Sequence, residues 1–416
     1  LLVGVVGSGI MAARLSPTDE GLQLFQNAVA TACVLIAVIA IFFIGDSSND
    51  SRHAAIGLPY FKAVSHFESG QYGLAVDELS EAIRLRSDDT EAYLLRGRAY
   101  NKLGQYQRAL EDFDKAVVLD TTLSAAYYNR AAAHFNLGQF QQAIDDFGQA
   151  IALDPTSALA FENRGAGYKS LGQDQRAADD FSQAGDAHLD LGQLQLAIEA
   201  YGKAIESDPN SGKPYSGRGA AYQIQGESQR AIQDLDLAIQ LDPSLATAYD
   251  NRGAAYHNLV QPERAVRDFN KAIELDPSLP SAYNNRGAAN HVLGEFQQAI
   301  YDFDQALQLD PDLSNAYANR GAAYGSLGEH QRAISDYDRA IELDPTAAQA
   351  FNNRGGSYFN LGEVQRAIED FDQAVRLAPD YASAYANRGF AYSELGQTSK
   401  SESDNAKACS LNSELY

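Results

Sequence analysis

Residues 124–157 read SAAYYNRAAAHFNLGQFQQAIDDFGQAIALDPTS, and this stretch decides the fold because it holds two short helices joined by a turn. The first half opens with the aromatic Tyr127 and carries the small Ala131 four positions later, which lets helices approach closely. A glycine then ends this helix, since glycine adopts a left-handed turn without strain. In the second half Ala143 and Phe147 lie on one apolar stripe, and Asp-Pro ends the unit because proline cannot continue a helix.

The same unit repeats every 34 residues along most of the chain. Frames begin at residues 56, 90, 124, 158, 212, 246, 280, 314, 348 and 382, and an out-of-phase frame begins at residue 178. One helix pair cannot bury its apolar stripe alone, so neighbouring units are expected to stack into a continuous core. These features resemble the tetratricopeptide-repeat (TPR) family over about residues 56–416. The resemblance implies an all-α solenoid, a right-handed superhelix of helix-turn-helix pairs whose first helices line the concave face.

Three departures from the period predict local differences. Two successive turn glycines lie only 20 residues apart, so Asp174–Asp190 must serve two units as one longer helix or as a joint. Val260 replaces a turn glycine, and we expect that turn to differ from the others. Ser401 and Asn405 replace core residues in the last unit, as expected of a polar helix that caps a solenoid. The expected blocks are a first TPR block at 56–184, an out-of-phase repeat or joint at 185–211, a second TPR block at 212–400 and a capping helix at 401–416.

The N-terminal residues differ in composition from the repeats. Residues 21–45 carry no charge, and residues 28–44 read AVATACVLIAVIAIFFI. A helix over residues 21–45 reaches about 37 Å, against about 30 Å for the hydrocarbon of a bilayer, so the segment predicts one transmembrane helix. A buried soluble helix and a cleaved signal peptide are the alternatives, and the acidic residues before the run disfavour a signal peptide. We therefore expect a membrane anchor at residues 1–45 and a linker at residues 46–55.

Part of this anchor carries a second family resemblance. The stretches VVGSGIMAARLS and LFQNAVATACVLIAVIAIFF resemble the end of the first helix and the second helix of the major intrinsic protein (aquaporin) family. The Asn-Pro-Ala pore motif of that family does not follow, because the chain continues as GDSSNDSRHAA. The resemblance implies a remnant that is reused or fused as an anchor, with the repeats on the cytoplasmic side of the membrane. A soluble protein is the alternative.

The composition narrows the class of partner. The 416 residues carry a formal net charge of −23, and so acidic a surface repels nucleic acids and anionic lipid head groups. We expect neutral or basic protein or peptide partners, with the alternative that the charge only maintains solubility. Cys33 and Cys409 form no disulfide or zinc pattern, and the sequence holds no recognisable cofactor, metal or catalytic motif. These observations indicate a protein that is not an enzyme.

Asparagine recurs at the sixth place of most units. The ladder consists of Asn129, Asn163, Asn251, Asn285, Asn319, Asn353 and Asn387. The TPR resemblance implies that this place lies on the inner face of the first helix. An amide donates and accepts, so it can bond the backbone of an extended peptide without reading its side chains. The ladder resembles those of protein O-linked N-acetylglucosamine transferases and predicts a peptide-binding groove; the alternative is that each amide only bonds a neighbouring helix.

Arginine follows at the seventh place, and aspartate recurs at the matching place of the second helix. The arginines are Arg96, Arg130, Arg164, Arg218, Arg252, Arg286, Arg320, Arg354 and Arg388. The aspartates are Asp112, Asp146, Asp234, Asp268, Asp302, Asp336 and Asp370. Because opposite charges recur in one unit, we expect them to pair, with binding of a ligand carboxylate as the alternative.

Other groove places bear on the ligand. The fifth places hold no basic residue, which disfavours the carboxylate clamp of chaperone-docking repeats, and Glu162 and Asp250 favour basic peptides. His257 and His291 lie one period apart and are expected to face the groove, with a metal pair as the lesser alternative. We therefore expect a membrane-anchored scaffold that binds a protein partner in its concave groove. The alternative is the regulatory, substrate-presenting arm of an enzyme whose catalytic domain lies outside this chain.

Overall fold

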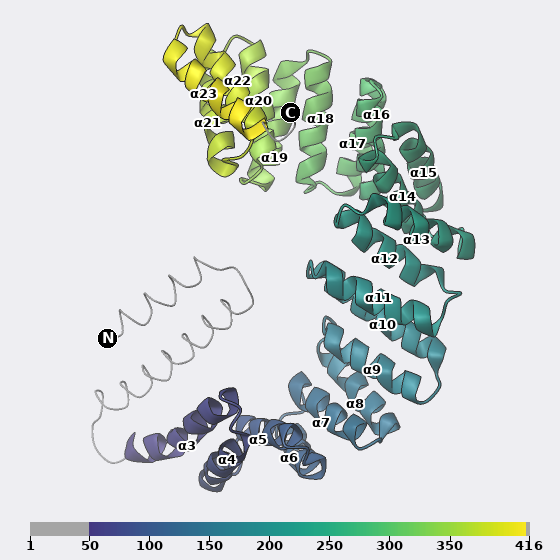
Figure 1. The fold of residues 1–416 in the computed structure, drawn as a ribbon, viewed down its shortest axis with the longest axis vertical. Coiled ribbons are helices and arrows are strands. Elements are labelled where there is room, and N and C mark those ends of the chain that lie inside the picture. The colour runs from purple at the N-terminus through teal and green to yellow at the C-terminus, as the bar shows by residue number, and fades with distance from the viewer. Residues whose placement is uncertain (1–49, 413–416) are drawn as a thin grey trace. The chain divides into compact units, whose positions relative to one another are not determined.

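The computed structural model describes residues 50–412, and every regular element in that range is a helix, labelled α3 to α23 (Figure 1). This confirms the all-α repeat architecture expected from the sequence. The predicted membrane anchor at residues 1–45 lies outside the described residues. Within residues 50–412, no helix combines the length and the apolar character that a membrane crossing needs.

Each repeat is a pair of helices joined by a short turn. The first helices are α3 (Asp50–Glu68), α5 (Thr90–Lys102), α7 (Ser124–Asn136), α9 (Ala158–Ser170), α12 (Gly212–Ile224), α14 (Ala246–Asn258), α16 (Pro280–Val292), α18 (Ser314–Ser326), α20 (Ala348–Asn360) and α22 (Ala382–Glu394). The second helices are α4 (Tyr72–Leu85), α6 (Tyr106–Leu119), α8 (Phe140–Leu153), α11 (Leu194–Ser207), α13 (Ser228–Leu241), α15 (Pro262–Leu275), α17 (Phe296–Leu309), α19 (His330–Leu343), α21 (Val364–Leu377) and α23 (Thr398–Asn412). The helix α10 (Asp174–Asp190) lies between α9 and α11 in the sequence.

Glycine forms the turn inside most repeats. Gly294 has a φ of 81°, and its N–H donates to the carbonyl of His291 at 3.0 Å. The N–H of Glu295 donates to the carbonyl of Asn290 at 2.9 Å. These bonds satisfy carbonyl groups that the end of a helix leaves without partners.

The turn at Val260 does not differ from the others, so that expectation was wrong. Val260 has a φ of 57°, and its N–H donates to the carbonyl of His257 at 2.9 Å. The N–H of Gln261 donates to the carbonyl of Tyr256 at 2.9 Å, as in the glycine turns. The packed helices on both sides impose the left-handed turn, although a β-branched residue is strained in that conformation.

A small residue of the first helix and an aromatic residue of the second form the core of each repeat. A Cβ atom on Gly253 would lie 2.6 Å from Cε1 of Phe269, and one on Gly287 would lie 2.7 Å from Cε1 of Phe303. Both phenylalanines are fully buried. Glycine therefore permits the close approach that closes the core. In the last repeat Asn405 takes the place of the aromatic residue and is exposed, so the stack ends in a polar surface.

The chain forms two compact units, and their boundary falls inside α10, between Asp180 and Phe181. With 17 residues, α10 is longer than α9, which has 13, and α11, which has 14, and it is one continuous helix. Asp180 accepts from Arg164 Nη2 at 2.7 Å, as the aspartate of a second helix does. Gly185 lies against Tyr201 as the small residue of a first helix lies against the aromatic residue of its second helix, since a Cβ atom on Gly185 would lie 2.5 Å from the ring. One helix therefore serves two repeats, as the short spacing predicted.

Candidate functional site

The first helices of the second unit form one layer. From α12 to α22, each first helix contacts the next first helix, whereas no two successive second helices within residues 181–412 make comparable contact. A stack whose first helices lie closer together than its second helices curves toward the first helices. The free faces of the first helices therefore line the inner side of this unit, which we call the groove.

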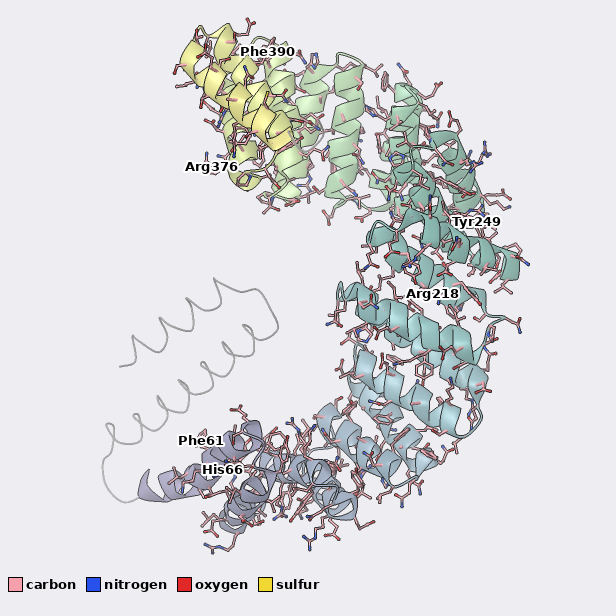
Figure 2. The ribbon with its side chains drawn as sticks, in the orientation of Figure 1. Phe61, His66, Arg218, Tyr249, Arg376 and Phe390 are labelled. Atoms are coloured by element: carbon pink, nitrogen blue, oxygen red, sulfur yellow. The ribbon has the colours of Figure 1, made fainter. Side chains whose placement is uncertain are left out.

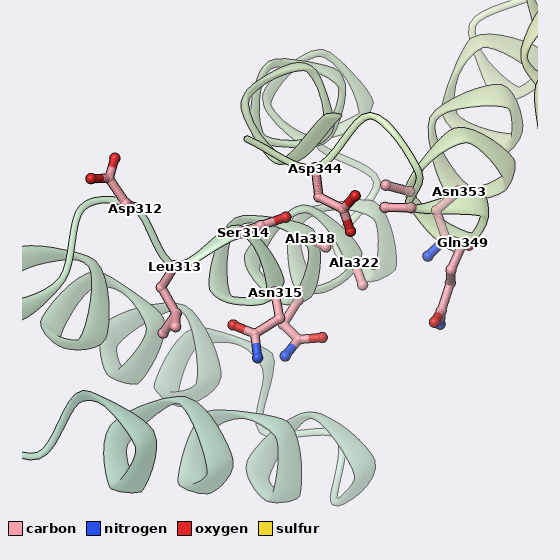
Figure 3. Close-up of a pocket in the computed structure, with 12 residues that line it drawn as sticks. Asp312, Leu313, Ser314, Asn315, Ala318, Ala322, Asp344, Gln349 and Asn353 are labelled. Atoms are coloured by element: carbon pink, nitrogen blue, oxygen red, sulfur yellow. The ribbon is translucent and has the colours of Figure 1, made fainter. Parts of the chain in front are cut away.

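A pocket of about 450 Å³ lies in this groove between α18 and α20 (Figure 3). Asn319 and Asn353, two of the predicted peptide-binding residues, line it, and Asn315 and Gln349 add two further amides. Gln349 and Asn353 on α20 lie across the pocket from Asn315 on α18. The other lining residues are Asp312, Leu313, Ser314, Ala318, Ala322, Asp344, Ala347 and Ala350. Amides above a floor of alanine offer hydrogen bonds to a backbone and leave room for side chains.

Most asparagines of the ladder bond the preceding repeat through their side-chain nitrogen. Asn319 Nδ2 donates to Oδ1 of Asn284 at 3.1 Å, from the sixth place of one repeat to the fifth place of the repeat before it. The same bond joins Asn163 to Tyr128 at 2.9 Å, Asn285 to Asp250 at 3.1 Å and Asn387 to Asn352 at 2.9 Å. The ladder thus ties first helices together, which was the alternative reading of these residues. One bond uses one of the two N–H groups of an amide and neither lone pair of its oxygen.

The remaining members of the ladder lack this bond. Asn129 Nδ2 donates to the carbonyl of Ala125 in its own helix at 2.7 Å. Asn353 has Ala318 at the fifth place before it; its side chain instead hydrogen-bonds Tyr337 on α19, and its Oδ1 accepts from Asn352 Nδ2 at 3.3 Å. Asn251 makes no side-chain hydrogen bond among residues 50–412. Among the ladder residues that the structure describes, Asn251 is therefore the one whose amide has no hydrogen-bond partner.

The predicted pairing of arginine with aspartate is confirmed in every repeat that carries both. Arg286 Nη2 lies 2.6 Å from Oδ1 of Asp302, and Arg286 Nε lies 3.1 Å from Oδ2. The two-bond pairs are Arg96–Asp112, Arg130–Asp146, Arg164–Asp180, Arg218–Asp234, Arg252–Asp268, Arg286–Asp302, Arg320–Asp336, Arg354–Asp370 and Arg388–Asp404. The bond to Asp336 raises the pKa of Arg320 and keeps the guanidinium charged. These arginines are occupied within the protein, so the structure does not favour their use as a ligand-carboxylate site.

Sequence reasoning missed a second partner of these arginines. Arg320 Nη1 lies 2.6 Å from Oδ1 of Asp304, which belongs to the preceding repeat. The same contact joins Arg130 to Asp114, Arg252 to Asp236, Arg286 to Asn270, Arg354 to Asp338 and Arg388 to Asp372. The signal was the polar residue that recurs two positions after most of the paired aspartates. For Arg164 and Arg218 (Figure 2), the position of this second partner holds Gly148 and Gly202, which have no side chain to make the contact.

Asp250 is a buried acid on α14 that pairs with no arginine or lysine among the described residues. Only 8% of its surface is exposed. Its carboxylate accepts from Ser281 Oγ at 2.8 Å and from Asn285 Nδ2 at 3.1 Å, both on α16. Burial raises the pKa of Asp250, and these two hydrogen bonds partly oppose that shift. The acid expected to favour basic peptides therefore lies mostly beneath the surface.

The two groove histidines lie apart from any metal-binding group. His257 Nδ1 is buried without a hydrogen-bond partner, and His291 Nε2 lies 3.0 Å from Ser326 Oγ. Burial lowers the pKa of both rings, so both are neutral at pH 7. Across the described part of the chain, no three metal-ligating side chains gather. The two histidines are polar groove residues, and the structure does not favour the metal alternative.

Family models of the tetratricopeptide repeat match residues 124–157, 280–313, 314–347 and 62–125. A TPR repeat model also matches residues 185–226, 261–294 and 355–396, and together these matches cover more than half of the chain. None of them falls on residues 1–45, so the aquaporin-like resemblance gains no support. No curated protein matches the chain.

Several solved structures resemble the chain. One is a crystal structure of MamA, 27% identical, which covers 40% of this chain and 96% of that chain with a TM-score of 0.35. Another is YrrB, described as a TPR protein with an unusual peptide-binding site, 28% identical, covering 45% and 96% with a TM-score of 0.37. The APC/C hetero-tetramer Cut9-Hcn1 is 17% identical and covers 91% and 90% with a TM-score of 0.46.

Proposed function

Because the chain belongs to the tetratricopeptide-repeat family, we propose that it is a protein-interaction scaffold that holds an extended peptide in the groove of its second unit. On this proposal the repeats carry no catalytic step. The observation that carries the proposal is the pocket between α18 and α20, where Asn319 and Asn353 face one space. The bond from Asn319 to the preceding repeat holds its amide in place, so less side-chain entropy is lost when a peptide binds.

The affinity expected from such contacts is moderate. A net hydrogen bond contributes about 1 kcal/mol, and ordering an extended chain costs about 1–2 kcal/mol for each residue. Backbone contacts alone therefore give weak binding, and side-chain contacts must supply the remainder. The net charge of −23 favours a neutral or basic segment and disfavours nucleic acid. We expect micromolar binding that depends on the sequence of the partner.

The test uses a random dodecapeptide library displayed on phage and the full chain as bait. Selected peptides are then measured by fluorescence anisotropy against the wild type and the Asn319→Ala/Asn353→Ala variant. We expect about a tenfold loss of affinity in the variant. Gln308→Ala is the matched control, because Gln308 lies on the second helix α17, is exposed and does not line the pocket. Equal affinities for all three proteins, at unchanged melting temperature, would remove the groove as the binding site.

We also propose that residues 21–45 anchor the scaffold in a membrane with its repeats in the cytoplasm. The support is the length and apolar character of that segment in the sequence. Flotation with lipid vesicles compares the full chain with a variant that lacks residues 21–45. Flotation of the full chain alone is expected; absence of both proteins from the vesicle fraction contradicts the anchor and leaves the scaffold proposal intact.

A further inference from the structure

Two places of the repeat meet across neighbouring first helices. The twelfth place of one first helix lies against the ninth place of the next first helix. Phe359 and Phe390 occupy these two places, and their ring centroids are 5.4 Å apart. In the first unit the same two places bring the guanidinium of Arg98 to 5.0 Å from the ring centre of Phe67. This register defines a diagonal row of paired positions along the groove. The other pairs of the second unit are Gln223–Ala254, His257–Ala288, His291–Ala322 and Gly325–Gly356.

The pair Gly325–Gly356 leaves open space in this row. A Cβ atom built on either glycine finds no heavy atom within 4 Å. Glycine weakens a helix, and here no close approach of another chain segment requires it, in contrast to Gly253 and Gly287 of the core. By this register the two open glycines lie next to the aromatic pair Phe359–Phe390 along the row, and we call these four positions, Gly325, Gly356, Phe359 and Phe390, the slot.

The slot is continuous with the pocket of the proposed function. Ala322, which lines the pocket, lies three residues before Gly325 on α18, and Asn353 lies three residues before Gly356 on α20. Residues three apart on a helix share one face, so a peptide bonded by the pocket amides passes the slot. Phe390, labelled in Figure 2, is 59% exposed and can therefore contact a ligand.

The charged residue beside the slot is acidic. Glu394 lies four residues after Phe390 on α22, is exposed, and forms no ion pair within residues 50–412. The second, fifth, sixth, ninth, twelfth and thirteenth places of α14 to α22 hold Asp250 and Glu394 and no lysine or arginine. A cationic side chain next to the slot therefore meets an unpaired carboxylate and no competing cation.

We propose that the slot binds an aromatic side chain of an extended protein segment, and that a lysine or arginine next to that side chain faces Glu394. An aromatic ring fills the space above the two glycines and packs against Phe359 and Phe390. The inference rests on the proposed peptide-binding function and specifies the class of segment that the groove selects.

The test repeats the dodecapeptide selection with the full chain and three variants. Peptides that carry an aromatic residue beside a basic one are expected to be enriched by the wild type. Gly356→Leu fills the slot and is expected to lower the affinity of these peptides by about ten- to hundredfold, the worth of one buried aromatic side chain. Its melting temperature should not fall, because leucine favours a helix more than glycine and open space surrounds this position.

Two further variants act as controls. Gly202→Leu makes the same substitution at another open glycine, on the second helix α11 outside the groove, and is expected to leave the affinity within about threefold. Glu394→Gln is expected to remove the preference for the basic residue and to keep the preference for the aromatic one. Enriched peptides without aromatic residues, or undiminished binding by Gly356→Leu, would overturn the slot while the groove stands. A selection that enriches no peptide would overturn the proposed function itself.

Discussion

Arg320 on α18 reaches back to Asp304 of the preceding repeat, with Nη1 2.6 Å from Oδ1, while its other nitrogens hold Asp336 of its own repeat. One guanidinium thus joins three helices, α17, α18 and α19. The side chain of Asp336 is buried, whereas that of Asp304 is 48% exposed. The repetition of this arrangement makes the charged residues part of the stack and not part of the groove.

Replacing Arg320 with alanine is expected to lower the free energy of unfolding by about 3–5 kcal/mol. The substitution leaves the carboxylate of Asp336 buried without its counter-charge, and that loss is larger than the worth of the pair itself. Urea unfolding followed by circular dichroism measures the change. Arg332→Ala is the control, because Arg332 is 68% exposed and pairs with an exposed glutamate one turn away. Similar losses in the two variants would contradict the role given to the buried pair.

Gly148→Asp is expected to stabilise the first unit. A Cβ atom on Gly148 would lie 3.7 Å from Nη1 of Arg164, so a carboxylate there can form the second contact that Arg320 makes with Asp304. Gly148→Asn is the matched control, since asparagine has a similar helix propensity and no charge. The aspartate variant should exceed the asparagine variant by about 0.5–1 kcal/mol, and the difference should shrink in about 1 M salt. A difference that salt does not change would exclude an ion pair.

The repeat architecture was predictable because its signals are local and recur. The spacing of glycine, alanine and the aromatic residue specifies each helix pair, and the pairing of Arg286 with Asp302 follows from opposite charges at fixed places. The shared helix α10 was also predictable, because a spacing of 20 residues leaves no room for two helices and two turns.

The remaining features depend on distances between repeats, which a linear pattern does not contain. The bond from Asn319 to Asn284 depends on the separation of α16 and α18. The turn at Val260 follows from packing on both of its sides, which overrides the local preference of valine. The slot at Gly325 became visible only when the space around the glycine was known.

Exchanging the turn residues of two adjacent repeats tests the strain at Val260. Val260→Gly is expected to raise the free energy of unfolding by about 1–2 kcal/mol, because glycine adopts a φ of 57° without a steric clash. Gly294→Val places valine at a φ of 81° in the next repeat and is expected to lower it by a similar amount. Urea midpoints of the two variants and the wild type give both values. Changes of the same sign in both variants would show that the φ angle is not what distinguishes these turns.

Asp250→Asn is expected to stabilise the second unit at neutral pH and to lose this advantage in acid. The folded pKa of Asp250 lies above 3.8, the ordinary value of an aspartate, so between these two values the folded state binds more protons than the unfolded state. Stability contributed by this group is therefore present below pH 3.8 and declines as the pH rises through the folded pKa. Asparagine carries no charge and can bond Ser281 and Asn285, as Asn284 and Asn352 bond their neighbours at the same place.

Asp242→Asn is the opposite control, because hydrogen bonds from Ser244 lower the pKa of that exposed carboxylate. Urea midpoints between pH 3 and pH 7 should diverge in favour of Asp250→Asn and against Asp242→Asn; a gap for Asp250→Asn that stays constant over this range would mean that its carboxylate titrates alike in both states.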